Sequence, residues 1–139
     1  MSDRPTVLVV DDDQDVVKAT SLRLRAAGYH IISAFDGGQG VLAAIDQQPD
    51  AILLDVRMPR MDGLAALEKL RQCDQTKDIP VVMLSASLVD KQAALDAGAR
   101  YFLTKPYEGE TLLAAVESAI TEASEHWTNS RISEAKMLC

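Results

Sequence analysis

The chain has 139 residues, of which 47% are hydrophobic and 25% are charged, a balance typical of one folded domain and unlike that of a disordered segment. The net charge of −7 argues against direct binding to nucleic acid, because phosphate contacts need clustered Lys and Arg. With two cysteines and no apolar run near the ~18 residues of a membrane span, we expect a cytoplasmic protein with no disulfide framework and no membrane partner.

Five short apolar segments, rich in Val, Ile and Leu, alternate with longer amphipathic segments. Continuous apolar runs of this length are typical of strands that are buried on both faces, as in a parallel sheet. Most of the runs end at a polar residue. The expected strands lie at residues 7–10, 31–32, 51–54, 81–84 and 101–103.

Helical patterns fill the gaps, because apolar or small residues recur there at spacings of three and four. Gly28 and Gly98 are suitable ends for the first and fourth helices. The segment Gly37-Gly38-Gln39-Gly40 lacks the spacing of a phosphate loop, and we interpret it as the loose start of the second helix. The five helical patterns cover residues 16–26, 41–45, 64–70, 89–97 and 113–123.

A strand followed by a helix, repeated five times, predicts an α/β fold with a doubly wound parallel sheet and helices on both faces. We expect one domain over residues 1–125, whose last helix ends near residue 125, and a C-terminal tail or helix extension over residues 126–139. The carboxyl ends of parallel strands meet at one edge of the sheet, where ligands bind. The polar side chains expected to meet there are Asp11, Asp12, Asp55, Ser85 and Lys105.

Three carboxylates at one edge repel one another by roughly 3–4 kcal/mol per pair at ~4–5 Å and an effective dielectric constant near 20. Lys105 or a hard divalent cation would offset this repulsion, and Mg²⁺ suits a site with few protein ligands and room for phosphate oxygens. Asp55 ends a central strand and is the natural nucleophile, because a carboxylate can attack phosphorus to form an aspartyl phosphate. Mg²⁺, Lys105 and the Ser85 hydroxyl would stabilise the charge of the transferred group.

Four segments carry a resemblance to a known family. They are Val-Leu-Val-Val-Asp-Asp-Asp at 7–13, Leu-Leu-Asp-Val-Arg-Met-Pro-Arg-Met-Asp-Gly at 53–63, Ser-Ala at 85–86, and Gly-Ala-Arg-Tyr-Phe-Leu-Thr-Lys-Pro at 98–106. In this order and spacing they resemble the receiver domain of two-component response regulators, of the single-domain chemotaxis-regulator type, over about residues 5–123. The resemblance implies a flavodoxin-like fold with strand order 2-1-3-4-5.

The resemblance also implies a role for each candidate residue. Asp55 matches the phosphoacceptor, whereas Ser85 and Lys105 match the hydroxyl and the ammonium group that contact the phosphoryl group. Lys105-Pro106 matches a cis peptide, and Phe102 occupies the switch position, where family members carry Tyr or Phe. The implied protein ligands of Mg²⁺ are Asp11, Asp12, Asp55 and the backbone carbonyl of Arg57.

A receiver domain is a signalling domain rather than a turnover enzyme, and promotes only its own phosphorylation and dephosphorylation. The implied phosphodonor is a sensor histidine kinase or a histidine phosphotransfer protein, and the implied target is an unidentified downstream protein, with a homodimer left open. We expect phosphorylation to change the surface of the fourth helix, fifth strand and fifth helix, around Lys91, Arg100 and Phe102. Ser85 and Lys105 stand at the entries to those elements.

Plainer interpretations exist for each residue. Taken alone, an aspartate cluster suits a helix N-cap, and a single serine or lysine suits an exposed loop; only joint placement at successive strand ends favours a site. A phosphatase of the haloacid dehalogenase type is the alternative function, since it also uses an Asp-x-Asp nucleophile after the first strand. That type needs a late acidic pair, for which only Asp90 and Asp96 are available, and it leaves Asp55 unexplained.

Overall fold

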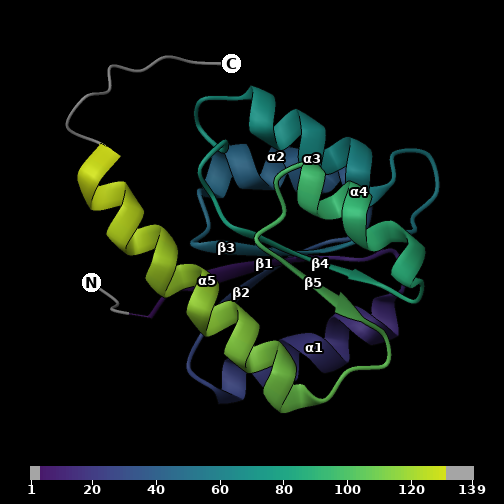
Figure 1. The fold of residues 1–139 in the computed structure, drawn as a ribbon. Helices are drawn as coiled ribbons and strands as arrows, with labels where there is room; N and C mark the ends of the chain where they lie inside the picture. Colours follow the sequence, from purple (N-terminus) through teal and green to yellow (C-terminus); the bar gives the residue numbers. More distant parts are fainter. Residues whose placement is uncertain (1–3, 131–139) are drawn as a thin grey trace.

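The computed structural model describes residues 4–130 of the chain, and their side chains up to residue 123. The elements are β1 (Thr6–Val10), α1 (Gln14–Ala26), β2 (His30–Ala34), α2 (Gly37–Gln47), β3 (Ala51–Asp55), α3 (Gly63–Gln72), β4 (Val81–Ser85), the single turn η1 (Leu88–Asp90), α4 (Lys91–Asp96), β5 (Tyr101–Thr104) and α5 (Gly109–Ser130). All strands are parallel and form one sheet in the order β2-β1-β3-β4-β5 (Figure 1). The predicted flavodoxin-like fold class is therefore confirmed.

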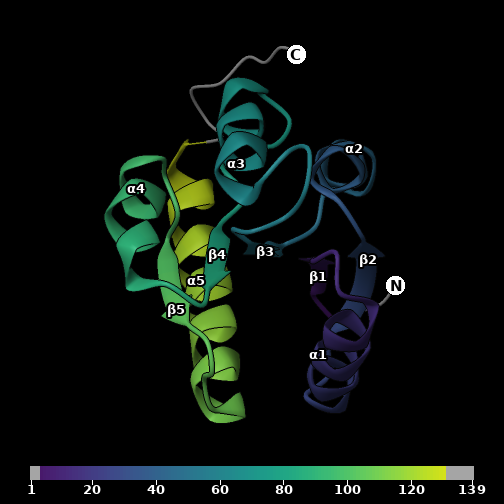
Figure 2. The same ribbon diagram turned by 90° about the vertical axis from the view of Figure 1, so that its right-hand side faces the viewer.

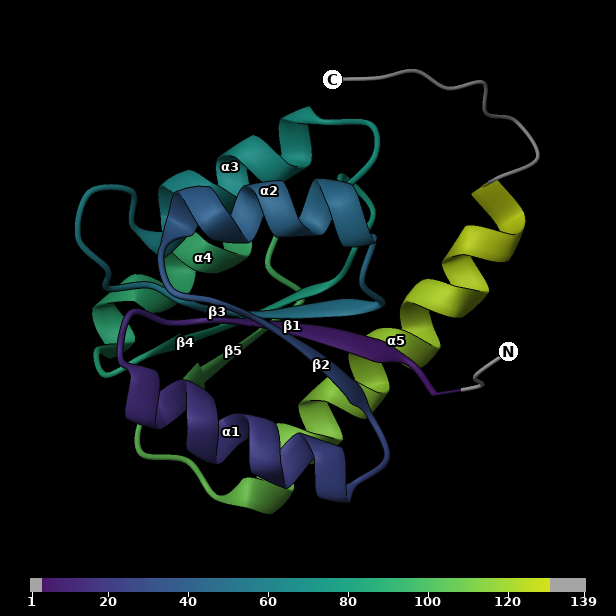
Figure 3. The ribbon, with the colours of Figure 1, turned by 180° about the vertical axis from the view of Figure 1, so that it is seen from behind.

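Helices bury the sheet from both sides, as Figures 2 and 3 show. Helices α2, α3 and α4 cover one face, and α1 and α5 cover the other. Successive side chains of a strand point to opposite faces, so each strand contributes to two separate cores. The core beside α2, α3 and α4 contains Leu8, Ile52 and Met83, and the core beside α1 and α5 contains Val7, Leu53 and Val82.

Aspartates begin three of the helices. The side chains of Asp13, Asp36 and Asp62 accept hydrogen bonds from backbone N–H groups in the first turns of α1, α2 and α3, respectively. These N–H groups have no partner within the helix, so a carboxylate there stabilises the helix start. Helix α2 begins at Gly37, which confirms the interpretation of the glycine-rich segment as a helix start.

Two helices differ from the prediction. The expected fourth helix is divided into η1 and the six-residue α4. Helix α5 continues to Ser130, past the predicted end near residue 125, so residues 126–130 form the helix extension that was one of the two predicted alternatives. No glycine or proline occurs between residues 110 and 130, and helix propensity therefore extends the helix beyond its apolar pattern. The rest of the predicted tail, residues 131–139, lies outside the described residues.

Two further expectations concern the backbone and the membrane. The Lys105-Pro106 peptide bond is cis, as the resemblance implied. Among residues 4–130, no helix is both long enough and apolar enough to cross a membrane.

We expect Gly63→Ala to destabilise the protein, because α3 begins in direct contact with the end of β3. A Cβ atom at residue 63 would collide with the carbonyl oxygen of Asp55 and would lie only 2.9 Å from the Cα atom of Val56. Since both neighbours belong to the backbone, the strand end would have to move. The free energy of unfolding, measured by urea denaturation, should fall by roughly 1–3 kcal/mol.

Gly38→Ala is the matched control, since it adds the same methyl group to the first turn of α2. There the nearest atom to the new Cβ is Oδ1 of Asp36, at 3.4 Å. Alanine is the better helix former by roughly 0.5–1 kcal/mol, so this variant should be as stable as the wild type or more stable. An equal loss in the free energy of unfolding of both variants would contradict the explanation by backbone packing.

Candidate functional site

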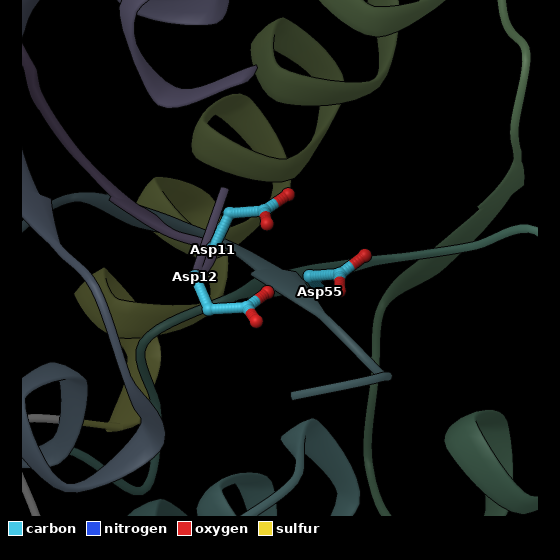
Figure 4. Close-up of side chains that lie close together, drawn as sticks. All are labelled: Asp11, Asp12 and Asp55. Carbon is cyan, nitrogen blue, oxygen red and sulfur yellow. The ribbon is translucent and has the colours of Figure 1, made fainter. Parts of the chain in front are cut away.

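Three carboxylates gather at the carboxyl end of the sheet. Asp11 and Asp12 directly follow β1, and Asp55 is the last residue of β3, the strand that pairs with β1. Each of the three offers one oxygen, and these oxygens all lie within 4.8 Å of one another. Figure 4 shows the side chains projecting from the two strand ends in the same direction. The expected convergence of the acidic residues is present.

The three carboxylates differ in their exposure. The residues Asp11 and Asp55 are only 3% and 5% exposed, whereas Asp12 is exposed. Oδ1 of Asp11 accepts a hydrogen bond from the backbone N–H of Asp13 at 3.0 Å, which fixes that carboxylate in place. The cluster is thus anchored on its buried side and open on the side of Asp12.

Lys105 supplies the positive charge of the site. It follows β5, and its long side chain reaches past β4 to the cluster. Its Nζ lies 2.7 Å from Oδ1 of Asp55 and 3.4 Å from Oδ2 of Asp11. One ammonium group therefore contacts both buried carboxylates.

Lys105 only partly offsets the charge of the cluster. Burial raises the pKa of Asp55, and the nearby Asp11 and Asp12 raise it further, against the lowering effect of Lys105. Burial also disfavours the charged form of Lys105, but its contacts with Asp55 and Asp11 outweigh that effect and raise its pKa. Three carboxylates and one ammonium group leave an excess of negative charge, which favours the binding of a cation.

The donor set fits a hard divalent cation. All the charged ligand atoms are carboxylate oxygens, which Mg²⁺ and Ca²⁺ prefer over softer donors. Two carboxylates are buried and one is exposed, so a bound cation would retain room for water or phosphate oxygens. The backbone carbonyl of Arg57 stays a predicted ligand.

Ser85 lies where the sequence placed it, at the end of β4, but within the described residues its hydroxyl makes no hydrogen bond to the three carboxylates. The residue is 1% exposed, and its Oγ donates a hydrogen bond of 2.6 Å to Oδ2 of Asp90. The same oxygen accepts the backbone N–H of Ser87 at 3.1 Å. Within the described part of the chain, Ser85 meets Lys105 only through the backbone, where the N–H of Lys105 donates to the Ser85 carbonyl at 2.8 Å.

The sequence did not predict the roles of two side chains beside this hydroxyl. Nε and Nη2 of Arg57 donate to Oδ2 and Oδ1 of Asp90 at 3.0 and 2.9 Å, which forms a two-bond ion pair. The sequence predicts a carbonyl ligand at Arg57 and offers Asp90 as a late acid of the phosphatase alternative, but it does not predict that the two side chains pair. An aspartate five residues after Ser85, at the entry to a helix, was the available signal.

Phe102 and Tyr101 lie on opposite faces of β5. Phe102 is half-buried and packs against the core beside α2, α3 and α4. Tyr101 packs on the other side, where its hydroxyl donates to Oε2 of Glu122 in α5 at 2.6 Å, and that contact raises the pKa of Tyr101. The switch role of Phe102 stays a prediction.

The sequence is similar to those of known response regulators. The family model of the response regulator receiver domain matches residues 7–117. The DNA-binding dual master transcriptional regulator RpaA of Synechocystis is 40% identical over 118 residues, which is 84% of this chain and 49% of that protein. The transcriptional regulatory protein PrrA of Mycobacterium tuberculosis is 40% identical over 128 residues, which is 91% of this chain and 54% of that protein.

Solved structures show the same similarity. The chemotaxis protein CheY4 of Vibrio cholerae has a TM-score of 0.78 at 34% identity, over 84% of this chain and 98% of that chain. The receiver domain of the sensor histidine kinase PA1611 from Pseudomonas aeruginosa has a TM-score of 0.79 at 30% identity, over 85% of this chain and 98% of that chain. That structure has a magnesium ion coordinated in its active-site cleft.

The chain belongs to the response regulator receiver domain family. It spans about half the length of the curated relatives that it matches. The phosphatase alternative has no support in these matches, and the identification as a two-component receiver is confirmed.

We expect Asp55→Asn to stabilise the fold at pH 7 in metal-free buffer. The raised pKa means that the folded state binds the Asp55 proton more tightly than the unfolded chain does. Stability is therefore lost as the pH rises from the ordinary value of 3.8 through the higher folded-state pKa. Asparagine keeps the shape without the charge, so the variant should have the larger free energy of unfolding, with a difference that shrinks as the pH falls towards 3.8.

Chemical denaturation with a chelator present, at a series of pH values, measures this difference. Asp13→Asn is the control, because it removes a neighbouring carboxylate outside the cluster while asparagine still caps α1. If Asp55→Asn were no more stable than the wild type at pH 7, Lys105 would have to offset the whole cost of burying the charged Asp55 carboxylate. That result would contradict the prediction that burial outweighs the contact with Lys105.

Proposed function

We propose that this receiver accepts a phosphoryl group on Asp55 in a Mg²⁺-dependent reaction. The observation that supports it best is that the two oxygens of the Asp55 carboxylate have different surroundings. Oδ1 is held by Nζ of Lys105 at 2.7 Å, whereas among residues 4–130 no hydrogen bond engages Oδ2. One oxygen is thus anchored and the other is available as a nucleophile.

The transfer would be a displacement at phosphorus. An oxygen of Asp55 forms the new O–P bond, the bond between phosphorus and the donor breaks, and the donor leaves with that electron pair. Lys105 is placed to attract the oxygens of the transferred group, whose charge is the main thing that the site must stabilise. The chain would modify only itself, as a signalling domain, rather than turn over a separate substrate.

Asp11, Asp12 and Asp55, with the backbone carbonyl of Arg57, would hold the Mg²⁺. When bound, the ion would neutralise the excess negative charge of the site and of the transferred phosphoryl oxygens. The choice of Mg²⁺ draws on the oxygen-only donor set and on the magnesium ion in the PA1611 receiver.

The phosphodonor in this proposal is a phosphohistidine on a sensor histidine kinase or a histidine phosphotransfer protein, and the target is a downstream protein. The similarity to the receiver domain of a sensor histidine kinase supports this class of partner. The output surface would include α4, β5 and α5, because Lys105, which lies between β5 and α5, contacts Asp55, and Ser85 ends the strand that leads towards α4. Two further predictions are a cytoplasmic location and no direct contact with nucleic acid. Formation of a homodimer stays open.

Phosphorylation is tested by intact-mass measurement after incubation with Mg²⁺ and acetyl phosphate. The wild type should gain ~80 Da, the mass of one phosphoryl group, through an acyl phosphate bond. Asp55→Asn should gain nothing, and Asp13→Asn, which loses a carboxylate outside the cluster, should be labelled as the wild type is. Labelling of Asp55→Asn to the wild-type extent would contradict the assignment of the phosphoacceptor.

Metal binding gives a second test that needs no phosphodonor. Asp12→Asn should weaken Mg²⁺ binding by roughly tenfold or more, since it removes one charged ligand from a site with few ligands. Asp13→Asn should change the affinity much less, because that side chain caps α1 instead. Titration of the backbone amide NMR signals with MgCl₂ measures both, and similar losses in the two variants would argue for a diffuse charge effect rather than coordination.

A further inference from the structure

The carboxylate of Asp90, which the phosphoryl-transfer proposal does not use, lies at the centre of a cluster with the side chains of Arg57 and Ser85. It accepts two hydrogen bonds from the Arg57 guanidinium and a third, of 2.6 Å, from the Ser85 hydroxyl. Arg57 follows β3, Ser85 ends β4, and Asp90 ends η1. The cluster therefore joins the loop after the phosphoacceptor to the loop that leads into α4.

The single proton of the Ser85 hydroxyl is already donated within this cluster. A hydroxyl has one proton to donate, and Ser85 donates it to Asp90 while its oxygen accepts the N–H of Ser87. The same proton cannot also be donated to a phosphoryl oxygen on Asp55. For Ser85 to contact the phosphoryl group, its hydrogen bond to Asp90 has to break.

That hydrogen bond is a strong one. Its acceptor is a carboxylate, its length is short, and the two residues are only 1% and 8% exposed. Arg57 fixes the acceptor by pairing with both of its oxygens, and these contacts, with Ser85, lower the pKa of Asp90. Asp90 therefore stays charged and in position at neutral pH.

We infer that Asp90, held by Arg57, is a latch that retains the proton of the Ser85 hydroxyl in a hydrogen bond until a phosphoryl group on Asp55 competes for it. The inference rests on the proposed phosphorylation of Asp55. Asp90 is a positioning residue, which acts through Ser85. It meets Arg57 at the guanidinium rather than at the carbonyl proposed as a ligand, and no hydrogen bond joins it to Asp11, Asp12 or Asp55 among the described residues. The strength of the Ser85–Asp90 bond then sets part of the free energy of the switch.

Two plainer roles for Asp90 have to be separated from a latch. The first is a helix cap, but the Asp90 side chain makes no capping hydrogen bond to α4. The second is simple electrostatic repulsion of an anion by the Asp90 charge. Repulsion does not depend on the Ser85 hydroxyl, whereas a latch does, so combining substitutions at the two positions distinguishes them.

The test is the affinity for beryllofluoride, a phosphoryl mimic, in the presence of Mg²⁺, measured by fluorine NMR titration. Asp90→Ala should bind the mimic about tenfold more tightly than the wild type, since one hydrogen bond to a charged acceptor no longer opposes binding. In a Ser85→Ala background, the same substitution should change the affinity less than about twofold, because there is no hydroxyl left to release.

Asp96→Ala is the control for charge, since Asp96 ends α4, the helix that follows η1, and contacts Gln92 rather than Ser85. It should leave the affinity near that of the wild type. Asp90→Asn, which keeps the side-chain shape and can still accept the Ser85 proton, should give a smaller gain than Asp90→Ala. This second variant keeps the test valid if alanine at position 90 disturbs the start of α4.

The latch also predicts a change in the NMR spectrum of the protein without any ligand. The amide signal of Ser87, whose N–H donates to the Ser85 hydroxyl, should shift in Asp90→Ala and not in Asp96→Ala. Provided that the wild type binds the mimic, two results would overturn the latch. One is that Asp90→Ala gains no affinity, and the other is that it gains equally in the wild-type and Ser85→Ala backgrounds. If the wild type neither binds the mimic nor gains phosphoryl mass, the phosphorylation of Asp55 itself is wrong.

Discussion

The fold holds more negative charge at one edge of its sheet than its own cations offset. Asp11 and Asp55 are buried beside each other, Asp12 lies within ligand distance, and Lys105 is the one cation in direct contact with the two buried carboxylates among residues 4–130. Carboxylates brought together in this way are costly, and the buried apolar strands below them supply the stability that keeps them in place. A binding site with this property favours cations, and in the proposed phosphorylation a cation would accompany the phosphoryl group.

Another part of the backbone is packed closely against the end of the central strand, β3. Helix α3 begins directly against β3, and the N–H of Gly63 donates to the carbonyl of Val56 at 2.8 Å. A side chain at residue 63 has no space, because the carbonyl of Asp55 occupies it. The position of Asp55, the proposed phosphoacceptor, is therefore fixed by main-chain packing and not only by its hydrogen bond to Lys105.

The sequence predicted the parts of the site that depend on backbone topology. Apolar runs located the strand ends, and parallel pairing brought Asp11, Asp55 and Lys105 together. The orientation of the Ser85 hydroxyl could not be predicted, because a serine at a strand end has several rotamers and the partner chosen depends on where the next helix begins. The single turn η1 turns Asp90 towards Ser85, and a pattern of alanines could not distinguish that turn from a longer α4. The end of α5 was missed for a related reason, since apolar spacing reports packing and not the length of a helix.

The place of β5 in the sheet has a mechanical consequence. It is an edge strand with β4 as its one neighbour, and it carries Lys105 at its end. A shift of this strand strains one ladder of hydrogen bonds, whereas a shift of β3 would strain two. Tyr101 and Phe102 of β5 pack against the cores on opposite faces of the sheet, and Tyr101 also bonds to Glu122 of α5. A displacement of Lys105 that moved β5 would therefore reach both helical layers while it strained the hydrogen bonds to one neighbouring strand.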